Sequence, residues 1–241
     1  MRAKVTVVIP AFNEEKFLGA CLKSLLSQEI KPDEIIVVDN NSVDHTAEIA
    51  KEFGAKVVKE KKQGICYARN AGFDAAKGDI IARCDADSIL FPDWIKRIHE
   101  DFENSGIIGV TGPCYFYDFV GKRGYKKMPK ILHTALFFKS SKLVLRHEIL
   151  FGSNMALLRG AWLKIRDEVC SNEKKFHEDM DLASHLAKYG TIQYDPQLIA
   201  TISARRVKSV KAYVDYPLRW IKSVRHGRKI RKLRKKKKSL K

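Results

Sequence analysis

Short apolar segments alternate with longer amphipathic segments through the first hundred residues. The apolar runs have the length and β-branched content of strands, and the runs between them have a helical period. The predicted strands are residues 5–9, 34–38, 55–59 and 79–84, and the predicted helices are residues 14–28, 44–53 and 64–76, with a further helix opening at Pro92. This alternation predicts βαβ units and a mainly parallel sheet that forms a nucleotide-binding layer.

The pattern becomes less regular after a predicted strand at 107–110. Aromatic residues cluster at 115–119, and a basic amphipathic stretch covers 126–146. Later residues again predict strands, at 153–158, 191–194 and 198–203, and a helix at 178–189. We therefore expect one α/β domain over 1–206, divided into halves 1–112 and 113–206, and a separate extension over 207–241.

The positive charge of the chain is concentrated in that extension. The sequence has 46 Lys and Arg against 28 Asp and Glu, a net charge of +18. Residues 205–241 hold 17 of these basic side chains and a single acid, Asp215, so the preceding residues are nearly neutral at +2. A polyanionic partner is expected for the extension and not for the domain.

Cysteine usage and the lack of targeting features favour the cytoplasm. The five cysteines are scattered, without a Cys-x-x-Cys pair or a zinc-like spacing to histidine, which is typical of reduced, buried thiols. Residues 1–9 have no charged leader, signal core or cleavage site, and no apolar run approaches the roughly 20 residues of a membrane span. We expect a cytoplasmic protein that lies on the inner face of the cell membrane if it contacts a membrane.

Polar residues follow several predicted strands. They are Asn13 and Glu14 after the first, Asp39-Asn40-Asn41-Ser42 after the second, and Asp85-Ala86-Asp87 after 79–84. An isolated acidic strand end is commonly a helix cap, and Asp44 before Thr46 has that pattern. Because ligands gather at the carboxyl ends of parallel strands, three such ends predict a cluster of hydrogen-bond acceptors at one edge of the sheet.

The Asp85-Ala86-Asp87 triplet is the main candidate for metal binding. Two carboxylates on one turn can hold a divalent cation together with a bound diphosphate, and Mg²⁺ and Mn²⁺ prefer such oxygen ligands. The triplet alone is a weak signal because acidic turns are common. Its position directly after a predicted strand strengthens it.

Six short motifs occur in a fixed order along residues 4–205. They are the segments 7–15 and 37–46, Ala68-Arg69-Asn70 with Asp85-Ala86-Asp87, Gly152-Ser153-Asn154-Met155, and Glu178-Asp179-Met180-Asp181-Leu182. In these motifs the chain resembles glycosyltransferase family 2. The resemblance implies a GT-A fold, which is a Rossmann-like α/β fold with a mixed, mainly parallel sheet flanked by helices, here followed by a basic amphipathic extension. It also implies that 1–112 binds a nucleotide-diphosphate sugar and that 113–206 binds a glycan or lipid-linked acceptor.

The resemblance assigns roles to the residues at the strand ends. The implied donor-binding residues are Pro10, Ala11, Asn13, Glu14, Asp39, Asn41, Arg69, Asp85, Ala86 and Asp87. Among them Asp39 would accept a hydrogen bond from the base or ribose, and Arg69 would reach the base edge. Asp87 would be the principal ligand of Mg²⁺ or Mn²⁺, with Asp85 beside it, and the ion would neutralise charge on the departing diphosphate.

The resemblance also implies a catalytic base in the Glu178-Asp179 pair. Neighbouring helix residues point about 100° apart, so both carboxylates cannot face the acceptor in the same way. Asp179 is the expected base of a single displacement with inversion, and by position alone both acids could equally serve the helix N-terminus. Gly152, Ser153 and Asn154 are expected at the acceptor or donor sugar, and a β-bulge or tight bend is the structural alternative. Arg205 and Arg206 could approach the diphosphate, although they more simply begin the basic extension.

Apolar residues recur with a helical period between 207 and 224, with basic residues between them. This pattern, followed by the polybasic run 228–238, is typical of a helix in an anionic membrane interface, with Pro217 expected to kink or split it. A solvated, disordered extension is the alternative. Residues 216–220 resemble the Gln-x-x-Arg-Trp element of processive synthases, but Tyr216 replaces the Gln, which favours transfer of a single sugar.

Two other classes of protein fit part of the sequence. A polyanion-binding protein without catalytic activity would use the basic extension, but stacking aromatics and a nucleic-acid-binding module are lacking, so no specific nucleic acid is expected. A nucleotidyltransferase with a GT-A-like fold would carry a Gly-rich, basic loop after the first strand. This chain has Ala11-Phe12-Asn13-Glu14 there, which favours the sugar transferase.

Overall fold

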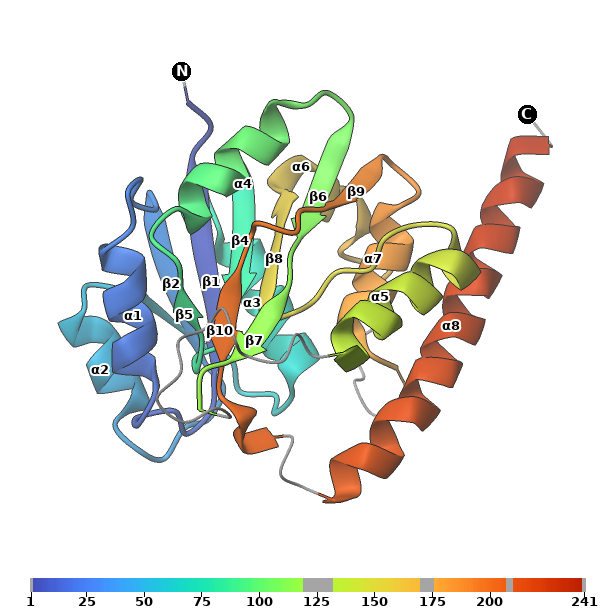
Figure 1. Cartoon of the computed structure of the whole chain (residues 1–241). Helices are drawn as coiled ribbons and strands as arrows, with labels where there is room; N and C mark the ends of the chain where they lie inside the picture. Colours follow the sequence, from blue (N-terminus) through green and yellow to red (C-terminus); the bar gives the residue numbers. More distant parts are fainter. Residues whose placement is uncertain (1, 119–131, 170–175, 207–209, 240–241) are drawn as a thin grey trace.

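The computed structural model describes residues 2–118, 132–169, 176–206 and 210–239. Phe119, Cys170, the start of the predicted 126–146 segment and the first residues of the extension lie outside these ranges. The described residues form an α/β structure with two sheets (Figure 1).

The larger sheet has seven strands among the described residues, in the order β3-β2-β1-β4-β8-β6-β9. These strands are β1 (Val5–Ala11), β2 (Glu34–Asp39), β3 (Lys56–Lys59), β4 (Ile80–Cys84), β6 (Ile107–Thr111), β8 (Asn154–Leu158) and β9 (Thr191–Tyr194). β8 runs antiparallel to β4 and β6, and the other pairings in this sheet are parallel. The mixed, mainly parallel sheet predicted from the sequence is confirmed.

Helices cover both faces of this sheet. On one face, side chains such as Val7 and Ile9 pack with α1 (Leu18–Leu26), α2 (Thr46–Glu52) and α4 (Trp94–Glu103). On the other face, Val8 packs in a cluster with α3 (Ile65–Ala75), α6 (Arg159–Ile165) and α7 (Glu178–Leu186). β1 is buried along its whole length because both of its faces are covered.

A second, smaller sheet joins distant segments next to the strand ends. Its order is β5-β10-β7, formed by β5 (Ile89–Leu90), β10 (Ala200–Ile202) and β7 (Cys114–Phe116). β5, β7 and α6 were not predicted from the sequence. β10 delivers the residues that follow it, including Arg205, to the end of β4.

The C-terminal residues form one long helix that lies against the domain. α8 (Val210–Ser239) continues through Pro217, so the predicted splitting at this proline does not occur. Its buried face contributes Val224 to a cluster with Leu145 of α5 (Leu132–Leu145) and Met180 of α7. Figure 1 shows α8 beside α5 and α7 at the edge of the molecule. None of the helices in the described part of the chain has the length and hydropathy needed to cross a bilayer.

Candidate active site

The loops after β1 and β2 are joined by hydrogen bonds. The Asn13 N–H donates to Ser42 Oγ at 3.0 Å, and the Val43 N–H donates to Asn13 Oδ1 at 2.9 Å. The Glu14 N–H donates to Thr46 Oγ1 at 2.8 Å. Asn13 adopts a left-handed backbone with φ of 55°, which asparagine tolerates better than most residues. The structure thus brings the first two polar strand ends together.

Residues 39–41, at and after the end of β2, form hydrogen bonds within their own turn and to the 60–64 loop. Asp39 Oδ1 accepts from the Ser42 N–H at 3.0 Å, which closes the turn after β2. Asn40, which we did not single out from the sequence, is buried and donates to the carbonyls of Glu60 and Lys62, at 2.8 and 2.7 Å. Asn41 donates to the carbonyl of Lys61 at 2.7 Å. The amides of both asparagines therefore hold the 60–64 loop in place.

Asp85, Ala86 and Asp87 follow β4 as predicted, next to the end of β1. Pro10 and Ala11 are the last residues of β1 and are buried, and Ala86 is buried between its two aspartates. Arg205 reaches this point from the end of the domain: its Nε donates to Asp87 Oδ2 at 2.9 Å, and its terminal nitrogen contacts both carboxylate oxygens of Glu14.

Arg205 therefore belongs to this edge of the sheet, not to the start of a solvated extension. Its guanidinium carbon lies 4.3 Å from the centroid of the Phe17 ring. Partial burial opposes its charge, but the hydrogen bonds to Glu14 and the charge of Asp87 outweigh burial and raise the pKa of Arg205. Arg205 and Glu14 are 191 residues apart in the sequence, so no local pattern could predict their contact.

Glu178 lies in a buried network of charges. Both of its carboxylate oxygens are paired, one with Arg69 and the other with Arg83. Burial raises the pKa of Glu178, but the two guanidinium groups outweigh burial and lower it overall. Because the carboxylate is enclosed by arginines, Glu178 is placed to hold the start of α7 and not to receive a proton from an acceptor.

Arg69 has a different contact from the one that the sequence resemblance implied. Its side chain is fully buried and donates to the carboxylate and to the main-chain oxygen of Glu178, the latter at 2.9 Å. In this structure the Arg69 guanidinium is directed at Glu178, and the implied contact with a base edge stays a prediction. The side chain extends under α7 because Glu178 is a buried carboxylate that requires a cation.

Arg83 is a site residue that the sequence analysis missed. It lies in β4 directly before the Asp85 loop, and its guanidinium approaches Asp85 Oδ1 at 3.6 Å as well as Glu178. Burial opposes its charge, but Glu178 and Asp85 outweigh burial and raise the pKa of Arg83. The available signal was an arginine inside an otherwise apolar strand, since a buried charge requires partners.

Asp179 is in a different environment from its neighbour. Its Oδ2 accepts from the Gly152 N–H at 3.3 Å, and its Oδ1 accepts from the Met180 N–H at 2.8 Å. Burial and then the adjacent charge of Glu178 raise the pKa of Asp179, against the opposing effects of His177 and Arg83. A carboxylate that is held by its neighbours and made more basic is suited to accept a proton.

Gly152 and Ser153 connect this carboxylate to the Asp85 loop. Ser153 Oγ donates to Asp85 Oδ2 at 2.5 Å, while the neighbouring Gly152 N–H donates to Asp179. A Cβ at Gly152 would lie 2.9 Å from a terminal nitrogen of Arg83, so glycine permits this close approach. Two consecutive residues, Gly152 and Ser153, thus contact Asp179 and Asp85 respectively.

Asn154 was expected at the acceptor or donor sugar, but its side chain is buried within the protein. Its side chain accepts from Trp94 Nε1 at 2.7 Å and donates to the carbonyls of Pro113 and Leu198, at 3.1 and 2.6 Å. Since both polar atoms of the amide are satisfied internally and the residue is inaccessible to solvent, Asn154 links the larger sheet to segments next to the smaller one.

The residues at this edge fit a divalent ion of the Mg²⁺ or Mn²⁺ type. Asp85 and Asp87 offer carboxylate oxygens, the ligand type that these ions prefer. Asp87 already binds a cation, the guanidinium of Arg205, which shows that positive charge is stabilised at this point. A metal ion at Asp87 Oδ2 would share that oxygen with the Arg205 guanidinium or displace the guanidinium from it.

The chain is similar to curated glycosyltransferases. GlyG of Streptococcus pneumoniae serotype 4 is described as a glycosyltransferase and is 32% identical over 124 residues, 49% of this chain and 41% of GlyG. The glucosyl-dolichyl phosphate glucuronosyltransferase of Haloferax volcanii is 27% identical over 127 residues, 50% of this chain and 41% of that protein. The chain thus aligns with about two fifths of the length of these curated relatives.

A solved structure has the same fold. The mannosyltransferase PcManGT from Pyrobaculum calidifontis, determined in complex with GDP-Man and Mn²⁺, superposes with a TM-score of 0.73 and 18% identity, over 92% of this chain and 63% of that chain. This likeness confirms the GT-A fold. The family model described as glycosyl transferase family 2 matches residues 6–164. The chain therefore belongs to glycosyltransferase family 2.

Proposed function

We propose that the chain transfers a single sugar from a nucleoside-diphosphate sugar to a hydroxyl group of a glycan or lipid-linked acceptor. The observation that carries this proposal is the pair of contacts made by Gly152 and Ser153, which set the Asp179 carboxylate beside the Asp85-Ala86-Asp87 loop. A donor with its diphosphate at Asp85 and Asp87 would present its anomeric carbon towards Asp179.

Asp179 is the proposed general base. Its raised pKa, caused first by burial and then by Glu178, favours proton uptake from an acceptor hydroxyl. The Gly152 and Met180 N–H groups fix both of its oxygens. Attack from the side of Asp179, opposite the leaving diphosphate, gives inversion at the anomeric carbon.

Asp87 and Asp85 are the proposed ligands of Mg²⁺ or Mn²⁺. The bound ion would neutralise negative charge on the departing diphosphate. In this arrangement Arg205, which contacts Asp87 and Glu14 in the structure, is the residue placed to change partner. We infer that the released guanidinium binds the diphosphate, for which its planar donors are well suited.

The outer face of α8 supports attachment to an anionic membrane surface. Leu218 and Ile221 are exposed there, and Lys222, Arg225 and Lys229 are exposed along the same helix. We propose that this surface places the protein at the inner face of the cell membrane, next to a lipid-linked acceptor; vesicle flotation measures the attachment. Trp220 lies in the segment that resembles an element of processive synthases. Its Nε1 donates to Ser141 Oγ of α5 at 2.9 Å, so this side chain contacts another helix of the protein. We take this as support for transfer of a single sugar.

A thermal-shift panel of UDP-, GDP- and dTDP-sugars with and without Mn²⁺ tests donor binding. A donor at about 100 times its dissociation constant stabilises the native state by about 2.7 kcal/mol. For a protein of this size that corresponds to an increase in Tm of about 5–10 °C. We expect one nucleotide sugar to give this shift with Mn²⁺ and a smaller one without it, and Asp87→Asn to abolish the difference. No shift with any sugar nucleotide in the presence of Mn²⁺ would refute the proposal.

A further inference from the structure

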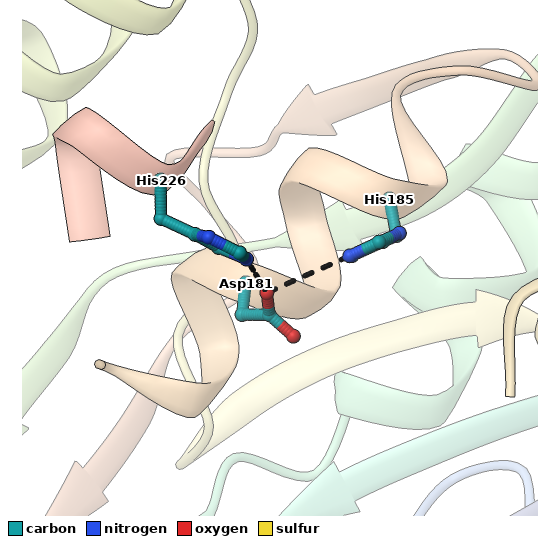
Figure 2. Close-up of side chains that lie close together, drawn as sticks. All are labelled: Asp181, His185 and His226. Atoms are coloured by element: carbon teal, nitrogen blue, oxygen red, sulfur yellow. Dashed lines mark ion pairs between the residues drawn. The ribbon is translucent and has the colours of Figure 1, made fainter. Parts of the chain in front are cut away.

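A second cluster of metal-ligand side chains lies between α7 and α8, apart from the Asp85 loop (Figure 2). Asp181 and His185 are one turn apart on α7, and His226 comes from α8. Asp181 Oδ1 lies 3.0 Å from His226 Nε2 and 3.6 Å from His185 Nε2. Figure 2 shows both rings directed at the aspartate, one from each helix.

The spacing of these atoms matches a tetrahedral metal ion. Zinc binds histidine nitrogen and carboxylate oxygen at about 2.0–2.2 Å, so two ligands of a tetrahedral ion lie about 3.4 Å apart. The two distances from Asp181 Oδ1 bracket this value, and all three ligand atoms lie within 4.8 Å of one another. The three atoms are therefore close enough together to be candidates for sharing one ion.

The surroundings of the cluster hold the rings in this orientation. Glu168 Oε2 lies 3.2 Å from His185 Nδ1, the arrangement in which a carboxylate orients a metal-binding histidine from behind. Lys188 neutralises the same Glu168 oxygen and lies 3.1 Å from His185 Nδ1. The His226 ring is stacked on Phe176 with 4.3 Å between centroids.

Burial and charge also suit a bound cation. The side chain of Asp181 is 1% exposed and that of His185 is 8% exposed, whereas that of His226 is 31% exposed and leaves a path for the ion. A carboxylate so thoroughly removed from water is stabilised by a nearby positive charge. Two imidazoles and one carboxylate favour Zn²⁺ over Mg²⁺, which prefers oxygen ligands.

We propose that Asp181, His185 and His226 bind a zinc-like divalent ion that joins α8 to α7. The same helices are already linked where α7 begins, because the His177 N–H donates to Ser223 Oγ at 2.8 Å. The ion would therefore fix the C-terminal helix against the helix that carries Asp179. This inference is independent of the proposed sugar transfer and uses none of its residues.

Metal titration of the full chain tests the proposal. The protein is freed of metals with a chelator, exchanged into buffer with excess Mg²⁺ to occupy the Asp85 and Asp87 oxygens, and titrated with Zn²⁺ or Co²⁺. We expect one equivalent to bind and Co²⁺ to give the intense visible absorption of a tetrahedral site. His226→Gln is expected to weaken binding at least about 10-fold, and Glu168→Gln, which alters the group behind His185, about 10- to 100-fold.

A matched control separates this site from other histidines. His45→Gln makes the same change at an exposed histidine before α2 and should leave the titration unchanged. His226→Gln is preferred over changes at Asp181, because the buried Asp181 could be needed for folding; circular dichroism checks the fold of each variant. The proposal is overturned if the native chain binds no equivalent of Zn²⁺ in excess Mg²⁺. It is equally overturned if His226→Gln binds as tightly as the native chain, or if binding is lost in Asp87→Asn instead.

Discussion

Glu178 and Asp179 are adjacent in sequence but have opposite electrostatic environments. Glu178 is paired with Arg69 and Arg83, which lower its pKa despite burial. Asp179 is half-buried. Desolvation first, and then the negative charge of Glu178, raise the pKa of Asp179. Helix geometry separates the two side chains by about 100°, so one faces the arginines and the other faces Gly152. The two acids therefore differ in the effect of mutation.

Asp179→Asn is expected to reduce kcat by a factor of about 10² to 10⁴ while the donor-induced thermal shift is retained. The amide keeps the shape of the side chain but cannot accept the proton. In the native enzyme the acidic limb of the pH profile should lie above the ordinary range of an aspartate, because the base is active only when deprotonated and its pKa is raised. Steady-state kinetics across pH measure both effects, and native turnover by Asp179→Asn would exclude Asp179 as the base.

Glu178→Gln should act mainly on stability. Removing one partner of a buried charge network leaves Arg69 and Arg83 without their common carboxylate, at a cost of about 3–5 kcal/mol. Denaturant unfolding measures this loss. A Glu178 variant with unchanged stability and greatly reduced turnover would instead point to a direct catalytic role.

Asp101 is expected to make stability depend on pH. Burial, and then the charge of Asp195, raise its pKa from 3.8 to about 6. The folded state therefore binds more protons than the unfolded state between these values, so the stabilising contribution is complete below about pH 4 and is lost as pH rises through about 6. Asp101→Asn, which cannot ionise, should raise the free energy of unfolding by roughly 1–3 kcal/mol at pH 7.5. Thermal unfolding should show little gain at pH 4, and an equal gain at both pH values would contradict this explanation.

The close approach of α8 to α7 depends on Gly227. A Cβ at this position would lie 2.7 Å from Ser184 Oγ and 2.9 Å from Leu145 Cδ2. The absence of a side chain thus allows α8 to contact both α5 and α7. Arg231 adds a hydrogen bond from α8 to the carbonyl of Leu145 at 3.2 Å.

Gly227→Ala should lower the free energy of unfolding by about 1–3 kcal/mol, because the added methyl group overpacks the helix contact. The matched control is Gly160→Ala in α6, where a Cβ would meet no atom within 4 Å. There the better helix propensity of alanine should raise stability by about 0.5–1 kcal/mol. Opposite signs in denaturant unfolding are the expected result, and stabilisation by both changes would mean that α8 is not closely packed in solution.

α8 combines a face that packs on the domain with an outer face that is basic. Val224, Gly227 and Ile230 are buried, whereas Lys222 and Arg225 are exposed. Because the buried face belongs to the same cluster as Leu145 and Met180, deletion of the extension would disturb the domain as well as remove charge. Charge reversal on the outer face is the cleaner test of membrane attachment.

Replacing Lys222, Arg225 and Lys229 with glutamate should weaken binding to anionic vesicles by roughly 100-fold or more, since each basic residue near such a surface contributes about 1 kcal/mol. The control variant reverses Lys23, Lys51 and Lys59, which are exposed on the domain itself. Flotation should show loss of binding for the first variant and little change for the second. Equal recovery of both with the vesicles would remove the case for attachment through α8.

Local patterns in the chain were enough to predict the order of the elements and the positions of the polar strand ends. Apolar runs and helical periods are local properties, so β1, β2, β4 and α7 appeared close to their predicted positions. The motif Asp85-Ala86-Asp87 and the Glu178-Asp179 pair were likewise recognisable, because each is contiguous in the chain.

Which charges pair depends on how elements far apart in the chain pack together. Arg69 contacts Glu178 across 109 residues, and Arg205 contacts Glu14 across 191. Burial of Asn154 and the meeting of Asp181 with His226 arise in the same way, from packing between distant elements. A buried charge or amide must find a partner, but which partner lies within reach depends on how the sheet and helices are packed, and no local period in the sequence encodes this.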